Sequence, residues 1–172
     1  RYFKNEKYKD IQKAYLFSNI GFNVRPTEIN GGFGIEQFKK FPHILQSRVR
    51  NGRFFINLLR KYPEFFHIPH VPEGIKHAWF GLPIHVKDGA PFQRKEFEGF
   101  LNKKGVETRQ IMAGDITIQP AFELFKSRVS GDLKNTKLIH RNAFFVGNHP
   151  LIREKERQLL SGCFKEFLRK YK

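Results

Sequence analysis

The stretch that decides the fold is Gly21–Ile29, which reads GFNVRPTEI. It places the amide of Asn23 and the guanidinium of Arg25 just before a helix start, because Pro26 suits the first turn and Thr27 is a typical N-cap residue. Backbone N–H groups at a helix N-terminus favour anions. The stretch therefore predicts a helix that begins beside a bound phosphate or sugar.

A second informative stretch, about eighty residues later, is Glu107–Asp115, which reads ETRQIMAGD. It places Arg109 at the end of an expected strand, and a glycine turn follows. A guanidinium pairs with phosphate or with vicinal hydroxyls through two hydrogen bonds. Arg109 is therefore the predicted substrate-binding residue. The alternative is a surface ion pair with Glu107 or Asp115, which would contribute only about 0–1 kcal/mol.

Neither stretch contains a nucleophile, a metal cluster or a redox pair, so an essential part of any enzyme chemistry lies elsewhere. Around them, apolar periodicity predicts an α+β fold in which helices cover one side of a short sheet. The expected helices are 26–41, 43–61, 92–104, 121–125, 133–141 and one after Pro150, and the expected strands are 78–86, 106–112 and 143–147.

Proline, glycine and polar residues set the expected boundaries. Pro42 separates the first two helices, and Pro83 indicates an edge strand or a bulge. Gly105 is expected in the left-handed conformation after a helix. Two residues, Asn135 and Thr136, are the candidate caps of the helix over 133–141.

The helix over 26–41 carries an apolar stripe with three glycines inside it. The stripe is Ile29, Phe33, Phe38 and Phe41, and the glycines are Gly31, Gly32 and Gly34. Each glycine costs about 1 kcal/mol relative to alanine in a helix. We therefore expect another backbone to pack closely there, either that of a partner subunit or that of a missing part of the protein.

The composition sets limits on function. The chain has 172 residues, 20 phenylalanines and a net charge of +16, which favours polyanionic partners or simply makes a solvated basic surface. A single cysteine, Cys163, excludes a disulfide within the chain and fits a reducing cytoplasm. No apolar run approaches eighteen residues. The start at Arg1, with no signal-peptide pattern, suggests an excision from something longer.

Several segments, in order and at sensible spacing, make the chain resemble the DegT/DnrJ/EryC1/StrS family of PLP-dependent sugar aminotransferases, which includes 4-keto-6-deoxyhexose 3-dehydratases. The segments are Gly21–Ile29, Phe33–Lys40, Trp79–Ile84 (WFGLPI), Gly105–Arg109, Ala113–Asp115, Gln119–Phe122 and Gly147–Pro150 (GNHP). The resemblance covers about residues 17–170. The chain departs from the family pattern at Gly31-Gly32, where Ala-Ala is usual, and at Asp115, where asparagine is frequent.

The resemblance implies the small C-terminal domain of a type I aminotransferase fold. Residues 1–20 would be an arm or the tail of a missing large domain, 21–63 connecting helices, and 64–172 the small α+β domain. It also implies a cytoplasmic PLP enzyme that acts on a nucleotide-linked 4-keto sugar in deoxysugar, aminosugar and lipopolysaccharide biosynthesis, as a homodimer. Trp79–Ile84 and Ala113–Asp115 lean toward the dehydratase-like branch, but the choice between aminotransferase and 3-dehydratase stays open.

The same resemblance assigns candidate roles to four residues. Asn23 would reach the PLP phosphate of the neighbouring subunit, or only shape a turn. Arg25 would bind phosphate, or a carboxylate in the dimer contact. Arg109 would bind substrate, and His149 would contact the sugar or assist proton transfer, or be a plain turn residue. The catalytic Schiff-base residue is expected outside this chain, which alone would be inactive.

Two other classes of function stay open at this point. The charge and the aromatic residues would suit a nucleic-acid-binding module, although no nucleic-acid-binding signature is present. A non-catalytic structural subunit is the second alternative. A metal site is not expected, because His67 and His70 have Pro69 between them and no third ligand is evident.

Overall fold

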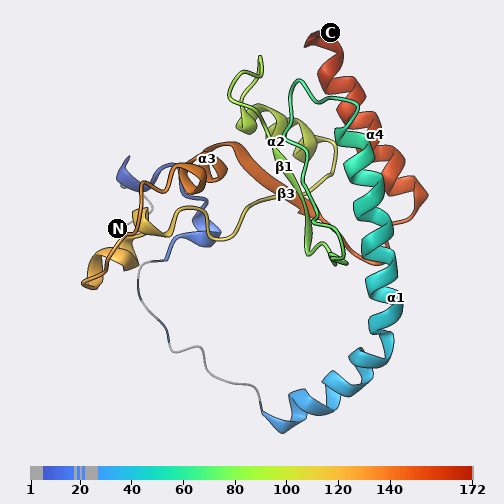
Figure 1. Ribbon diagram of the computed structural model, residues 1–172, viewed down its shortest axis with the longest axis horizontal. Helices are drawn as coiled ribbons and strands as arrows, with labels where there is room; N and C mark the ends of the chain where they lie inside the picture. The colour runs from blue at the N-terminus through green and yellow to red at the C-terminus, as the bar shows by residue number, and fades with distance from the viewer. Residues whose placement is uncertain (1–5, 18, 20, 22–26, 172) are drawn as a thin grey trace.

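The computed structural model describes residues 6–17, 19, 21 and 27–171 (Figure 1). The predicted phosphate-binding residues Asn23 and Arg25 lie outside the described residues. No helix in the described ranges combines the length and the apolar character that crossing a membrane requires.

A three-stranded antiparallel sheet lies at the centre, in the order β1-β3-β2. Its strands are β1 (Gly81–His85), β2 (Thr108–Gln110) and β3 (Ala143–Gly147). The structure confirms the predicted strand over 143–147, whereas the other two strands are shorter than predicted. Pro83 lies on the edge strand β1, as its missing N–H requires.

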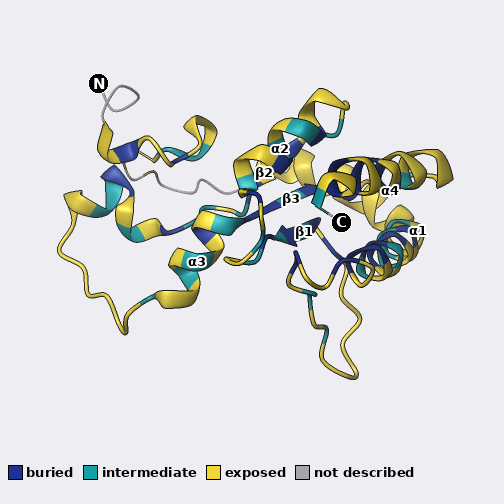
Figure 2. Ribbon diagram, turned by 90° about the horizontal axis from the view of Figure 1, so that it is seen from above, coloured by how far each residue is buried: buried dark blue, intermediate teal, exposed yellow. Residues whose placement is uncertain are grey.

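Three helices cover one face of this sheet: α1 (Glu28–Leu59), α2 (Arg94–Lys103) and α4 (Glu154–Leu168). The covered face carries Leu82 and Ile84 from β1 and Phe144 and Val146 from β3, all of them buried. Figure 2 shows the buried residues concentrated where these helices meet the sheet. The predicted α+β layer, with a sheet covered on one side, is confirmed. The remaining helix, α3 (Lys134–Asn142), leads directly into β3.

Phenylalanine rings build the centre of the core. The ring of Phe97 lies 4.9 Å from that of Phe164, 5.6 Å from that of Phe66 and 6.1 Å from that of Phe144, measured between centroids. All four side chains are fully buried. Because aromatic side chains bury large areas, a few short elements make a solid core.

The first two predicted helices are one continuous helix, so the predicted break at Pro42 was wrong. Pro42 lies inside α1, which bends along its length in Figure 1. A proline removes one backbone hydrogen bond and kinks a helix. Here the helix continues because Phe55, Leu58 and Leu59 anchor its C-terminal half in the core.

The N-terminal half of α1 extends away from the rest of the molecule (Figure 1). Its predicted apolar stripe is exposed: Ile29 is 74% and Phe38 75% accessible. A Cβ added at Gly31, Gly32 or Gly34 would meet no atom of the described residues within 4 Å. The close packing expected at these glycines therefore does not come from the described part of this chain.

Other local expectations were partly corrected. Thr27 is the N-cap residue of α1, but its hydroxyl bonds the Asn30 side chain at 2.9 Å and not a backbone N–H group. The cap of α3 is Leu133, and Asp132 accepts the Lys134 N–H, so the prediction of Asn135 or Thr136 was wrong. A local side-chain acceptor two residues upstream completes the helix start. Gly105 has φ +80°, as expected after α2.

The N-terminal segment is short and irregular. Within residues 6–17 it forms the 3₁₀ turns η2 (Glu6–Tyr8) and η3 (Lys13–Tyr15). Further 3₁₀ turns follow β2 at η4 (Ile116–Ile118) and η5 (Pro120–Leu124), and η6 (Arg169–Tyr171) continues α4. Tyr8 and Ile11 are buried, so the segment packs against the body of the protein.

Candidate functional site

A cavity of about 500 Å³ contains both residues that the sequence proposed for substrate contact, Arg109 and His149. Its walls come from the C-terminal half of α1, the start of α4, the ends of the strands and the N-terminal segment. The lining also includes Tyr15, Arg48, Asn51, Phe54, Phe80, Phe145, Asn148, Glu156 and Arg157. The fold thus brings together side chains from segments far apart in the sequence, such as Tyr15 and Arg157.

Arg109 lies on β2, on the sheet face that the helices leave open. Its Nη2 is 2.8 Å and its Nε 2.9 Å from the same carboxylate oxygen of Glu107. The Glu107 carboxylate, which accepts from Arg109, and after it the side chain of Tyr15 raise the pKa of the Arg109 guanidinium above its usual range. The side chain is 57% exposed, so the ion pair leaves N–H groups available to a ligand.

The alternative partner named from the sequence, Asp115, is occupied elsewhere. Its carboxylate accepts from the Thr117 N–H at 3.0 Å and from the Thr117 hydroxyl at 2.6 Å, and the residue is buried. Asp115 therefore caps η4. The substrate-binding role of Arg109 stays a prediction.

Two further arginines of the cavity were not singled out from the sequence. Arg157 of α4 donates from Nη1 to the Asn51 side chain at 3.1 Å and from Nη2 to Glu154 at 2.7 Å. Its guanidinium lies 5.9 Å from the centroid of Phe54. The Nε of Arg48 is buried and has no partner among the described residues. Only the position of α4 and β3 relative to α1 shows that Arg48 lines a cavity.

Asn148 holds the turn that carries His149. The residue is 3% exposed; its side-chain N–H donates to the Trp79 carbonyl at 2.8 Å, and its oxygen accepts from Asn51 at 3.1 Å. The same Asn51 amide donates to the His149 carbonyl at 3.4 Å. This buried network joins α1, the loop before β1 and the end of β3. A buried polar residue on the inward face of α1, Asn51, was the available sequence signal for it.

His149 is exposed, and its Nδ1 accepts the Leu151 N–H at 3.2 Å. With Nδ1 an acceptor, the neutral ring carries its proton on Nε2. The residue thus shapes the turn before α4 and also lines the cavity. Its position is compatible with both alternatives given from the sequence, a turn residue and a residue that contacts the sugar. The contact with a sugar stays a prediction.

The electrostatics of the cavity suit an anionic or hydroxyl-rich ligand between aromatic walls. Three guanidinium groups, those of Arg48, Arg109 and Arg157, face two carboxylates, those of Glu107 and Glu156. The pKa of Glu156 is lowered by the backbone N–H of Arg153, which donates to it at 2.8 Å. Phenyl rings from three elements provide flat apolar surface beside these charges.

These residues do not by themselves fit PLP. Among the described residues that line the cavity there is no lysine to supply a Schiff-base amine and no aspartate to pair with a pyridine nitrogen. We therefore assign no step through PLP to them. In the ranges that the structure describes, no three side chains of His, Cys, Asp or Glu gather in a way that would hold a metal ion.

A second cavity, of about 940 Å³, lies between the start of α2 and α3. Three of its basic side chains are paired: Arg94 with the His140 carbonyl at 2.8 Å, Lys95 with Asp10 at 3.1 Å, and Arg141 with Asp88 at 2.9 Å. Since these contacts join elements of the fold, this cavity is a weaker candidate for ligand binding than the first.

The comparisons with known proteins agree with the resemblance seen in the sequence. A sequence model described as the DegT/DnrJ/EryC1/StrS aminotransferase family matches residues 1–163. The chain is 29% identical over 153 residues to lipopolysaccharide biosynthesis protein RfbH of Salmonella typhimurium, covering 89% of this chain and 35% of that protein. It is 30% identical over 142 residues to GDP-4-keto-6-deoxy-D-mannose 3-dehydratase of Yersinia pseudotuberculosis, and the match covers 82% of this chain and 35% of that protein.

Among solved structures, a GDP-4-keto-6-deoxymannose 3-dehydratase with a trapped PLP-glutamate geminal diamine superposes with a TM-score of 0.72. It is 28% identical in sequence, and the match covers 93% of this chain and 40% of the other. The chain therefore spans about a third of the length of the curated relatives that it matches.

Proposed function

The chain belongs to the DegT/DnrJ/EryC1/StrS aminotransferase family, and from this premise we propose that it is the C-terminal part of a PLP-dependent enzyme that acts on a nucleotide-linked 4-keto sugar. The reaction is amine transfer or C3 deoxygenation, in deoxysugar, aminosugar and lipopolysaccharide biosynthesis. The names of the relatives support this substrate class and include the 3-dehydratase reaction. The residue that separates the two reactions is expected outside this chain.

The observation that carries the proposal is the cavity shared by Arg109, His149, Arg48 and Arg157. Guanidinium groups bind phosphate through two parallel hydrogen bonds, and they bind hydroxyls as donors. Arg48 supports a ligand role in particular, because its buried Nε has no partner in the described part of the chain and would gain one from a bound oxygen. The phenyl rings that line the cavity, those of Phe54, Phe80 and Phe145, suit a nucleobase or a sugar ring.

In this proposal Arg109 binds the substrate, and His149 offers its Nε2–H to a sugar oxygen. The cofactor is PLP, which would supply an electron sink when bound. Asn23 and Arg25, from the sequence, would contact its phosphate. The amine and the ring-binding residues come from polypeptide outside this chain, so the 172-residue chain alone is inactive.

A titration tests the binding half of the proposal. GDP and inorganic pyrophosphate are added to the ¹⁵N-labelled chain, and backbone amide shifts report where they bind. We expect the largest shifts at the cavity residues on β2 and in the turn after β3. Arg109→Gln should weaken binding about tenfold, as expected for a lost charge-assisted bond of about 1.4 kcal/mol. The matched control is Arg53→Gln, which changes an exposed arginine of α1 outside the cavity.

The result that would contradict this proposal is equal binding by the two variants, or shifts spread over the basic surface. Salt-dependent binding to random oligonucleotides, with no response in the cavity, would favour the nucleic-acid module instead. A separate measurement concerns the cofactor. On addition of PLP, the chain alone should show no visible aldimine absorbance, and a stable aldimine on it would overturn the assignment of the amine to other polypeptide.

The exposed half of α1 supports a second subunit as a partner. Five large apolar residues are exposed there, namely Ile29, Phe33, Ile35, Phe38 and Phe41. An exposed apolar patch of this kind is typical of an interaction surface. Three glycines in the same half would let a second backbone approach closely.

A further inference from the structure

Two buried glutamines join the N-terminal segment to the loop that follows β2. They are Gln110, 3% exposed, and Gln119, fully buried. Both lie on the body of the protein, and both use their side-chain amides on the backbone of residues 12–17. Buried amides need partners for their oxygen and their N–H groups. Both amide oxygens, and the side-chain N–H of Gln119, find partners in a segment about a hundred positions earlier in the sequence, whereas the side-chain nitrogen of Gln110 lies 3.0 Å from Nδ1 of His140.

Gln110 makes a reciprocal pair with Gln12. The Gln12 backbone N–H donates to the Gln110 side-chain oxygen at 3.2 Å, and the Gln110 backbone N–H donates to the Gln12 side-chain oxygen at 3.1 Å. Each glutamine thus completes the backbone bonding of the other. β2 is an edge strand of the sheet, and the bond to Gln12 gives a partner to the backbone N–H of its residue Gln110.

Gln119 makes a second connection next to the first. Its oxygen accepts the Phe17 N–H at 3.1 Å, and its Nε2 donates to the Tyr15 carbonyl at 3.0 Å. The Ala121 N–H then donates to the Phe17 carbonyl at 2.9 Å. The Tyr15 carbonyl and both backbone polar groups of Phe17 are therefore hydrogen-bonded to the loop after β2.

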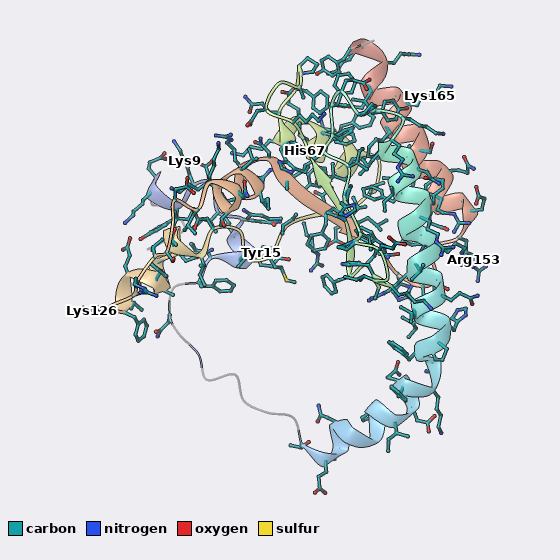
Figure 3. All side chains as sticks on the ribbon, in the orientation of Figure 1. Lys9, Tyr15, His67, Lys126, Arg153 and Lys165 are labelled. Atoms are coloured by element: carbon teal, nitrogen blue, oxygen red, sulfur yellow. The ribbon has the colours of Figure 1, made fainter. Side chains whose placement is uncertain are left out.

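The consequence for the cavity concerns Tyr15, which Figure 3 labels on this segment. Its side chain is half-buried and lines the same cavity as Arg109. Glu107, the ion-pair partner of Arg109, belongs to the same lining. Arg109 comes from β2, whereas Tyr15 comes from the segment that the two glutamines hold. The segment is thus a wall of the cavity and not a free arm.

We propose that Tyr15 is a positioning residue for Arg109, and that Gln110 and Gln119 hold it in place by binding the backbone of residues 12–17. The inference deepens the proposed function and rests on it where ligand affinity is concerned. It predicts that a change at Gln119, which does not line the cavity, alters how the cavity binds an anion.

The test compares Gln119→Met with Gln37→Met, which changes an exposed glutamine of α1. Amide hydrogen exchange is followed at Phe17 and Ala121, with Leu160 and Phe164 of α4 as internal references. In Gln119→Met we expect at least tenfold faster exchange at Phe17 and Ala121 and unchanged exchange in α4. Equal protection at Phe17 and Ala121 in both variants would overturn the role of Gln119.

The second arm uses Tyr15→Phe, which keeps the ring and removes the hydroxyl. We expect faster exchange of the Arg109 Nε–H in this variant and in Gln119→Met, with the Phe17 amide still protected in Tyr15→Phe. Pyrophosphate affinity should fall at least threefold in both. An unchanged Arg109 Nε–H signal would overturn the positioning role. If the unsubstituted chain binds no pyrophosphate, the proposed function fails, while the exchange measurements still decide this inference.

Discussion

The indole ring of Trp79 lies against the backbone of α1 at Gly52, so closely that a Cβ on Gly52 would be 2.3 Å from the indole Cδ1. Both residues are buried. Trp79 has a left-handed φ of 49°, and its backbone N–H donates to Nδ1 of the His77 ring at 3.0 Å. Its carbonyl accepts from Asn148. The contact therefore links α1 to the turn that carries His149.

Gly52→Ala should destabilise the protein, although alanine is the better helix former by about 1 kcal/mol. Overpacking a rigid, buried contact costs about 1–3 kcal/mol, and the clash with the indole decides the sign. The free energy of unfolding, measured in urea, should fall. Gly162→Ala is the matched control, because a Cβ there would meet no other atom within 4 Å. It should raise stability by about 0.5–1 kcal/mol. A gain in stability at both positions would contradict the close contact.

Asn148→Ala should lower the free energy of unfolding by about 1–3 kcal/mol, because it removes one of the two bonds of the buried Asn51 amide and the side-chain bond to the Trp79 carbonyl. Asn57→Ala, at an exposed position of α1 bonded only to Arg60 in the described structure, should change it by less than about 0.5 kcal/mol. Thermal unfolding measures both. Similar losses of unfolding free energy in the two variants would contradict a stabilising role of the buried network around Asn148.

Stability should fall as the pH falls from 7.5 to 5.5. Burial is the main cause of a lowered pKa at both His140 and His85, and Arg94 and His67, respectively, lower it further. Below the ordinary pKa of 6.5 the unfolded chain binds protons that the folded chain still excludes, so acid favours unfolding. His140→Gln should flatten this dependence, measured by urea unfolding at three pH values. An equally steep dependence in His140→Gln and in the unsubstituted chain would contradict the contribution of His140.

Gly32→Leu should weaken association of α1 with a second subunit by tenfold or more, because leucine would hold the two backbones apart. The folded monomer should keep its stability, since the structure offers open space at this position. Sedimentation velocity over a range of concentrations measures the association. Gly162→Leu provides the same change on another helix. Equal association in the two variants would argue against a partner at the glycines of α1.

Sequence patterns predicted those elements whose signals are local. The run Ala143–Gly147 became β3 because its aromatic and β-branched residues suit a buried strand. Gly105 ended α2 because the left-handed conformation favours glycine. Pro42 was misread, since the packing of Phe55 and Leu59 against the core outweighs the cost of a proline inside a helix.

Site residues divide in the same way. Arg109 and His149 could be named in advance because each follows a strand signal and belongs to a family motif. Arg48, Arg157 and Tyr15 could not, because each comes from a different element and none carries a local pattern that differs from a surface residue.

The amino-acid sequence alone determined the family, the helix-covered sheet and two of the residues that line the cavity, because periodicity and motifs depend on neighbours in the chain. Only the tertiary structure decided which arginines face one cavity, which asparagines are buried and that the N-terminal segment forms a wall. Those properties depend on distances between segments that are far apart in the sequence. Such segments can form hydrogen bonds with one another only after the chain has packed.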